Sequence, residues 1–451
     1  MTRRSGYALL SAIIALIVAL SAAIYAGVAA DDGTAVSTGG DRHVNRGSAP
    51  RNAAPASTGT WVGSWSASPV GGEPGTETEG LGGRSVRNVV HTSVGGTSAR
   101  ITLSNLYGQS ALTVTHASIA LAAADGTAAA LGGTMRRLTF GGSTGVVIPP
   151  GEQAVSDAVQ IAVAHGSDVL VTTYSPTRSG PVTYHPHARQ ISYAAVGDVT
   201  EDVTGTAYTE QTSYWRYLTA VDVLSKESDG TVVVIGDSLT DGVTSTEGAN
   251  RRWPDVLSER LRTAVAAGRD VPRYSVVNEG ISGNRLLTDG LGRPAESQSG
   301  LGRFERDVLG RPNVKVVVVD LGVNDILRNQ DPTDPDTDPG RILDGLRSLV
   351  DRAHARGIKV VGATLMPFKG HRGYTGPREE VRRSINAEIR AGRVFDGVVD
   401  FDEAVRDPYD PRRFRSDYDS GDHLHPSDKG YARMAEVFDL EELKGSAPAE
   451  L

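Results

Sequence analysis

Two patterns of apolar and polar residues divide most of this chain. Between residues 60 and 225, short alternating runs such as 99–103 (ARITL) and 112–115 (LTVT) are separated by Gly, Asn and Pro. Alternation with a period of two predicts strands with one buried face, and helical periodicity is hard to find in this region. We therefore predict an all-β domain over residues 60–225, a sandwich of the jelly-roll type.

Between residues 226 and 441 the pattern predicts strands that alternate with helices. Apolar runs such as 231–235 (TVVVI) and 316–319 (VVVV) are typical of buried strands. Helices are predicted at Pro254–Ala267, Arg341–Arg356, Arg378–Arg390 and Ser427–Phe438, and strands at Val360–Leu365 and Val398–Phe401. The repeated strand–helix–strand order predicts an α/β domain, in which helices cover both faces of a parallel sheet.

The N-terminal residues follow neither pattern. Arg3 and Arg4 precede an uncharged stretch, 5–30, that ends in small residues typical of a cleavage site. We predict that residues 1–30 are a signal peptide or, because the stretch is long enough to span a bilayer, an uncleaved signal anchor. Both alternatives place the rest of the protein outside the cell. Residues 31–59, rich in Gly, Ser and Ala, are predicted to be a disordered linker, and 442–451 a flexible tail.

The first buried strand of the α/β region ends in a candidate nucleophile. The run 231–242 (TVVVIGDSLTDG) places Ser238 just beyond an apolar strand. Open α/β sheets bind ligands beyond the carboxyl ends of their strands, so the Ser238 hydroxyl is placed where chemistry is expected. Gly, Asp and Ser also favour ordinary turns, and taken alone this segment fits a turn equally well.

A segment near the C-terminus supplies a candidate base. A serine hydroxyl is a weak nucleophile at neutral pH, and needs a base that is itself oriented by a carboxylate. Asp422 and His425 stand three residues apart in 422–426 (DHLHP), just before a predicted helix. His423 is the competing base, but adjacent residues of an extended chain project to opposite sides. We predict that His425 is the base and Asp422 its partner.

Two further strand ends offer hydrogen-bond donors. Asn324 follows the apolar strand that ends at Leu321, and Gly283 follows the strand that ends at Asn278. A tetrahedral intermediate of acyl transfer carries negative charge on one oxygen, which preorganised donors stabilise. We predict that the backbone N–H groups of Ser238 and Gly283 and the side-chain amide of Asn324 form this oxyanion hole. Each residue taken alone also fits a simple turn.

The four blocks together resemble the SGNH hydrolase superfamily of GDSL esterases and lipases. They are Gly236-Asp237-Ser238-Leu239, Gly283, Gly322-Val323-Asn324-Asp325 and Asp422-His423-Leu424-His425, in that order. The resemblance covers about half of the chain, and the preceding region is similar to the β-rich extension of some secreted members. It implies a three-layer α/β/α, flavodoxin-like catalytic domain over 226–441, with Ser238 as nucleophile, His425 as base, Asp422 as its partner, and Gly283 and Asn324 in the oxyanion hole.

Composition and missing motifs exclude several other classes. The formal net charge of −8 opposes binding to nucleic acid, and the absence of cysteine excludes disulfides and thiolate metal sites. The α/β-hydrolase elbow G-x-S-x-G lacks its second glycine here, since Thr240 stands in that place. There is no phosphate-binding P-loop, no H-E-x-x-H and no dinucleotide-binding glycine motif after a strand. We expect no cofactor, no metal and a monomer.

Three other features of the sequence are interpreted as structural rather than functional. Asp331, Asp334, Asp336 and Asp338 lack the glycine spacing of a calcium loop. His185 and His187 are interpreted as a pair on an edge strand, because metal binding needs at least one more ligand. The four tryptophans, Trp61, Trp65, Trp215 and Trp253, are interpreted as core residues more readily than as a sugar-binding platform.

The sequence thus predicts an extracellular serine ester hydrolase that acts on a small-molecule or polysaccharide acyl ester. No long amphipathic lid is evident, which favours short acyl groups. A lipase or phospholipase acting on lipid esters is the first alternative. The second is a surface protein that binds carbohydrate through its β domain and uses the downstream domain as a non-catalytic scaffold.

Overall fold

The computed structural model describes residues 59–290, 297–328 and 338–447, all of which belong to one compact unit. The segments for which a signal sequence or anchor and a linker are predicted lie outside the described residues, apart from Gly59. Within those three ranges no helix is both long enough and apolar enough to cross a membrane.

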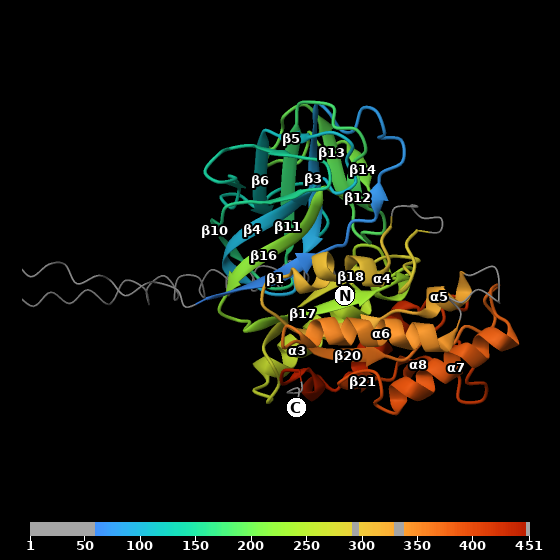
Figure 1. The fold of residues 1–451 in the computed structure, drawn as a ribbon. Coiled ribbons are helices and arrows are strands. Elements are labelled where there is room, and N and C mark those ends of the chain that lie inside the picture. The colour runs from blue at the N-terminus through green and yellow to red at the C-terminus, as the bar shows by residue number, and fades with distance from the viewer. Residues whose placement is uncertain (1–58, 291–296, 329–337, 448–451) are drawn as a thin grey trace, which may run out of the picture. The chain divides into compact units, whose positions relative to one another are not determined.

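Residues 60–225 form antiparallel sheets (Figure 1). The first sheet has the order β1 (Thr60–Ser66), β16 (Leu218–Ser225), β4 (Gly96–Ser104), β10 (Val159–Val163), and β9 (Gln153–Val155) also pairs with β4. The second has the order β14 (Glu210–Thr212), β13 (Ser192–Val196), β3 (Arg84–His91), β11 (Asp168–Ser175), β6 (His116–Leu121), β7 (Arg136–Arg137). Smaller sheets are β15 (Trp215–Arg216), β12 (Thr183–His185), β2 (Gly71–Gly72), and β5 (Leu112–Val114) with β8 (Val146–Ile148). The prediction of a β-rich region is confirmed.

Apolar residues from both large sheets form one core. Val86 and Val90 of β3, Ile101 and Leu103 of β4 and Ile119 of β6 belong to it, each at most 2% exposed. Burying such side chains removes apolar surface from water, which is the main stabilising contribution to a domain without disulfides.

The α/β region is built on a five-stranded parallel sheet. Its order is β18 (Tyr274–Gly280), β17 (Gly230–Gly236), β19 (Val314–Asp320), β20 (Lys359–Ala363), β21 (Gly397–Val399). Strand β17, the first of these five in the chain, lies between β18 and β19, and Gly236 is in register with both Gly280 and Asp320. The chain therefore changes direction across the sheet beside β17, and such a switch point is where open parallel sheets form a ligand crevice.

The four predicted helices are confirmed to within a few residues. They are α3 (Trp253–Ala266), α6 (Pro339–His354), α7 (Gly376–Arg390) and α9 (Asp428–Glu436). Several one-turn or irregular helices were not predicted: α2 (Ser238–Asp241), α4 (Gly300–Phe304), the π-helix η1 (Glu305–Leu309), α5 (Val323–Leu327), α8 (Phe401–Val405) and the 3₁₀-helix η3 (Leu440–Leu443).

Two predicted strands were extended too far. The strand predicted at Val360–Leu365 ends at Ala363. The strand predicted at Val398–Phe401 ends at Val399, and Phe401 instead begins α8. The side chain of Asp400 accepts a hydrogen bond from the backbone N–H of Glu403, so it caps the helix and ends the extended conformation.

Contacts between the β-rich region and the α/β region are direct and polar. The backbone N–H of Gly63 in β1 donates to Thr231 Oγ1 in β17 at 3.1 Å, and Ser68 Oγ donates to Glu279 Oε2 in β18 at 2.6 Å. Arg303 Nη1 donates to Ser68 Oγ at 2.8 Å. All these side chains are buried, so the two regions meet at a buried polar interface between separate apolar cores.

Candidate active site

Ser238 is the first residue of α2, directly beyond the carboxyl end of β17. The turn is tight: a Cβ atom at Gly236 would lie 2.1 Å from Thr240 Oγ1, so only glycine fits there. Asp237 caps α2, because its Oδ1 accepts from the backbone N–H of Leu239 at 3.0 Å. The helix stops at Gly242, whose φ is 88°. This turn presents Ser238 at the switch point of the sheet.

The structure brings His425 and Asp422 to Ser238. His425 Nε2 lies 2.9 Å from Ser238 Oγ, and His425 Nδ1 lies 2.6 Å from Asp422 Oδ2. Asp422 Oδ1 also accepts from the backbone N–H groups of Leu424 and His425. Partial burial alone would raise the pKa of Asp422, but these hydrogen bonds outweigh it and hold the pKa well below its usual range. Asp422 is thus an anion that fixes the ring of His425.

His423, the alternative base, lies elsewhere. Its φ is 63°, and its Nδ1 lies 2.6 Å from Asp419 Oδ2. A Cβ atom at Gly370 would meet its ring, so His423 packs against the segment around Gly370 and makes no hydrogen bond with Ser238. The two histidines diverge, but at a bend rather than in an extended segment, because the φ of His423 lies in the left-handed region.

Two backbone N–H groups at the site are candidate donors to an oxyanion. Gly283, with a φ of 79°, lies in a turn closed by the hydrogen bond from Asn284 N to Ile281 O at 2.9 Å. Within the described part of the chain, neither the N–H of Gly283 nor that of Ser238 has a hydrogen-bond acceptor. A backbone N–H without a protein acceptor can donate to another group, so both donors are available to a bound oxygen atom.

The side chain of Asn324 is fixed on both sides. Its Nδ2 donates to Asp237 Oδ2 at 3.0 Å, and its Oδ1 accepts from Arg328 Nε at 3.2 Å. An amide nitrogen carries two hydrogens, so one remains for another acceptor. The orientation of this donor is thus set by the cap of α2 and by α5, to which Asn324 itself belongs.

Three buried carboxyl groups surround the turn that holds Ser238. Burial raises the pKa of Asp237, and the nearby Asp320 raises it further. Burial also raises the pKa of Asp320 and of Asp325 to about 6. The carboxylate of Asp325 accepts from the backbone N–H groups of Leu286 and Leu287. It therefore fixes the segment that follows Gly283.

The structure also shows where the remaining sequence features lie. Asp331, Asp334 and Asp336 lie outside the described residues, and Asp338 caps α6 through the backbone N–H of Arg341. Among the side chains that the structure describes, no group of three or more His, Cys, Asp or Glu is arranged to hold a metal ion.

His185 does not lie on an edge strand. Strand β12 pairs on both sides, and the His185 side chain is buried against Asp241, which the sequence pattern gave no reason to expect. The tryptophans pack in the interior or against a cation: Trp65 contacts Trp215 edge to face, Trp253 stacks on Phe438, and Arg100 lies over Trp61.

Comparisons with known proteins give one family. Residues 234–433 match the model of the GDSL-like lipase/acylhydrolase family. Among solved structures, a protein of the G-D-S-L family from Desulfitobacterium hafniense DCB-2 is 21% identical, over 46% of this chain and 97% of its own, with a TM-score of 0.35. A GDSL-like lipase from Bacteroides thetaiotaomicron VPI-5482 is 22% identical, over 46% and 84%, with a TM-score of 0.32. Est24, a carbohydrate acetylesterase from Sinorhizobium meliloti, is 17% identical, over 46% and 96%, with a TM-score of 0.35. No curated protein matches the chain.

Proposed function

Because residues 234–433 form a domain of the GDSL-like lipase/acylhydrolase family, whose members are hydrolases that act on ester bonds, we propose that this protein is an extracellular serine esterase. In this proposal Ser238 is the nucleophile, His425 the general base and Asp422 the residue that orients it. The extracellular location rests on the predicted signal sequence or anchor.

The reaction follows from the contacts of Ser238. The Ser238 hydroxyl attacks the ester carbonyl carbon while its proton passes to His425 Nε2, which lies 2.9 Å away. The carbonyl oxygen becomes an oxyanion that accepts hydrogen bonds from Ser238 N–H, Gly283 N–H and the Asn324 amide. The intermediate collapses, and the alcohol leaves with the proton from His425. Water, deprotonated by His425, then attacks the acyl-enzyme and releases the acid and the free serine.

One observation carries this proposal. Ser238 and His425 are separated by 187 positions in the chain, yet their reacting atoms lie within hydrogen-bond distance, with Asp422 on the far side of the ring. A scaffold that only positions a glycan-binding domain has no need of this arrangement. For this reason we favour catalysis over the alternative of a carbohydrate-binding protein with an inactive α/β domain.

We propose that the substrate carries a short acyl group, such as acetyl, on a small molecule or a polysaccharide. The support is the absence of a long amphipathic lid from the sequence, since lipases that act at lipid surfaces need an apolar docking face. A lipid ester is the second candidate. We also propose that residues 60–225 form a jelly-roll-type sandwich and that residues 226–441 form a three-layer α/β/α domain.

The proposed function is tested with Ser238→Ala. We expect kcat/KM on a short aryl ester such as an aryl acetate to fall by about 10³-fold or more, because the nucleophile is removed. Ser384→Ala is the matched control, since Ser384 is an exposed serine of α7. Circular dichroism before the assay checks that both variants fold. Full activity in Ser238→Ala would refute the assignment. A series of aryl esters from acetyl to long acyl chains distinguishes an esterase from a lipase.

A further inference from the structure

One buried ion pair connects the β-rich region to the helix that carries Ser238. His185 belongs to β12, and Asp241 is the last residue of α2, three positions after Ser238. His185 Nε2 lies 3.0 Å from Asp241 Oδ1, and the two residues are 3% and 2% exposed. The mechanism described above uses neither side chain.

Both ring nitrogens of His185 face acceptors. Nδ1 lies 2.8 Å from the backbone oxygen of Ser68, and Nε2 faces the Asp241 carboxylate. A carbonyl oxygen cannot donate, so a proton is needed on Nδ1, and a second proton is shared between Nε2 and Asp241. An imidazolium paired with a carboxylate satisfies both contacts.

The second oxygen of Asp241 holds the turn that contains Gly283. Asp241 Oδ2 accepts from the backbone N–H of Ser282 at 2.9 Å and also from Ser282 Oγ. A Cβ atom at Gly280 would lie 2.3 Å from the backbone nitrogen of Asp241, so the strand end and α2 are in close contact. The orientation of the Gly283 N–H therefore depends on where Asp241 holds its neighbour Ser282.

We propose that His185 and Asp241 are positioning residues for the oxyanion hole, and that the β-rich region thereby takes part in acyl transfer. The chain of contacts runs from Ser68 and His185, through Asp241 and Ser282, to the N–H of Gly283. The inference rests on the proposed function, because it assigns these residues to the same reaction.

The surroundings of the pair favour its charged form. Burial alone would lower the pKa of His185, but Asp241 and the Ser68 carbonyl outweigh it, and the pKa is raised. Burial alone would raise the pKa of Asp241, but the His185 contact outweighs it, with contributions from His187 and Ser282, and the pKa is lowered. Arg252 opposes the protonation of His185, and the Trp215 ring lies 5.4 Å from the imidazole.

The test is His185→Gln, assayed with an aryl acetate. We expect kcat to fall about 10- to 100-fold while KM stays within about twofold, because a displaced oxyanion donor affects the transition state more than substrate binding. Affinity for an aryl trifluoromethyl ketone, which forms an oxyanion with the serine, should fall by the same factor as kcat. His91→Gln is the matched control: His91 also pairs with a buried aspartate, Asp168, but both members of that pair lie within the β-rich region. It should keep kcat within about twofold.

Two readouts separate positioning from a merely structural role. In the unmodified protein kcat should decrease as the pH rises through the raised pKa of His185, and this alkaline limb should be absent in His185→Gln. Ser282→Ala leaves the ion pair in place, removes the hydroxyl donor but keeps the N–H, and should lower kcat about three- to tenfold. If His185→Gln does not fold, Ser282→Ala replaces it as the test of this inference.

The possible outcomes distinguish a failure of this inference from a failure of the proposed function. Unchanged kcat, inhibitor affinity and pH profile in folded His185→Gln, or unchanged kcat in Ser282→Ala when His185→Gln does not fold, would overturn this inference and leave the proposed function intact. If the unmodified protein hydrolyses no ester, or Ser238→Ala is fully active, the proposed function itself is wrong and the inference falls with it.

Discussion

At the scale of single residues, one short loop contains two similar His–Asp pairs with different surroundings. Asp422 pairs with His425 beside Ser238, and Asp419 pairs with His423 away from it, both at 2.6 Å. We expect Asp422→Asn to lower kcat by about 10⁴-fold, because an amide cannot hold the ring in the required tautomer or stabilise its cation. Asp419→Asn is the control and should retain most activity. Equal losses of activity in the two variants would show that Asp422 supports only the conformation of the loop and has no specific part in catalysis.

The buried carboxyl groups near Ser238 allow a second residue-scale prediction. The folded-state pKa of Asp320, about 6, lies above its unfolded value. The folded protein therefore holds an extra proton between about pH 4 and 6, and the associated stability is lost as the pH rises through this window. At pH 7 the buried charge remains as a cost. Asp320→Asn should raise the free energy of unfolding at pH 7 by about 1–3 kcal/mol, measured by urea denaturation.

Asp325 is the comparison for this variant, since burial raises its pKa to the same value of about 6. Asp320 accepts from one hydroxyl, that of Thr240, whereas Asp325 accepts from two backbone N–H groups. An asparagine at 325 leaves one of these N–H groups unsatisfied. Asp320→Asn should therefore be more stable than Asp325→Asn by about 1–3 kcal/mol. The opposite order would contradict the interpretation of both sites.

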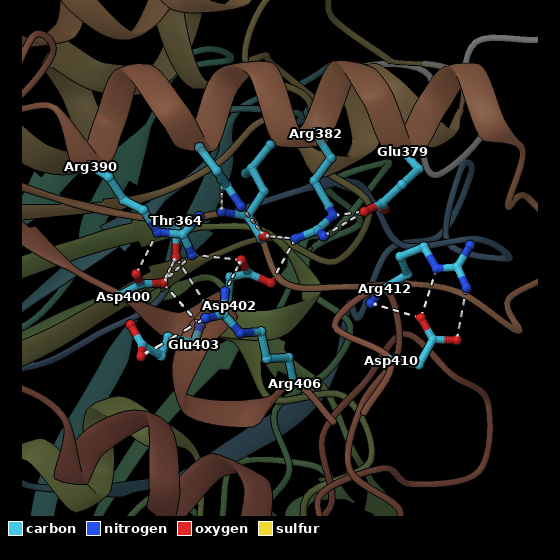
Figure 2. A network of polar contacts seen from close by, with 12 residues as sticks. Thr364, Glu379, Arg382, Arg390, Asp400, Asp402, Glu403, Arg406, Asp410 and Arg412 are labelled. Carbon is cyan, nitrogen blue, oxygen red and sulfur yellow. Dashed lines mark hydrogen bonds and ion pairs between the residues drawn. The ribbon is translucent and has the colours of Figure 1, made fainter. Parts of the chain in front are cut away.

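At the scale of elements, α7 is attached to the segment around α8 by a network of charges centred on the buried Arg382 and Asp402, shown in Figure 2. Arg382 donates to both Glu379 and Asp402, and Asp402 also accepts from Arg390 and Arg406. Removing one partner of a buried pair leaves a desolvated charge. Asp402→Ala should lower the free energy of unfolding by about 3 kcal/mol, at the low end of the usual range because Glu379 still pairs with Arg382.

The control for this network lies on the same helix. Arg383 and Glu380 form an ion pair whose side chains are 65% and 76% exposed. Exposed pairs contribute little, so Glu380→Ala should change the free energy of unfolding by at most about 0.5 kcal/mol. Similar losses for Asp402→Ala and Glu380→Ala would show that burial of the network does not determine its contribution.

The elements also show what a sequence pattern can and cannot predict. The strands β17 and β19 were predictable because burial makes them continuous apolar runs, and the long helices α3, α6 and α7 because burial of one face imposes a period on their residues. The helices α2, α5 and α8 were not, because one turn is too short to show a period. Their starts depend on single side chains or glycine turns, such as the Asp237 and Asp400 caps.

At the scale of the whole molecule, the candidate site was easier to predict than its support. The candidate site residues stand at strand ends or in motif order, so the sequence alone was enough to group them. They are Ser238, Gly283, Asn324 and the Asp422–His425 pair. The contact of His185 with Asp241 joins two regions of different architecture, and no periodic pattern of the sequence predicts such a contact. The same holds for Ser68, which lies between β1 and β2 and contacts Glu279.

The buried interface between the two regions predicts that both unfold together. Ser68 Oγ donates to the buried carboxylate of Glu279 and accepts from Arg303, so Ser68→Ala leaves Glu279 with one hydrogen bond fewer. We expect the free energy of unfolding to fall by about 1–3 kcal/mol, because an unsatisfied buried group retains its desolvation cost. The β-rich region contributes Trp61, Trp65 and Trp215 to the tryptophan fluorescence. We expect native fluorescence and esterase activity to be lost in one transition, and the substitution to shift the urea midpoints of both by the same amount. Activity lost at a lower urea concentration than fluorescence, in either protein, would show that the α/β region unfolds separately and that its contacts with the β-rich region do not couple the two.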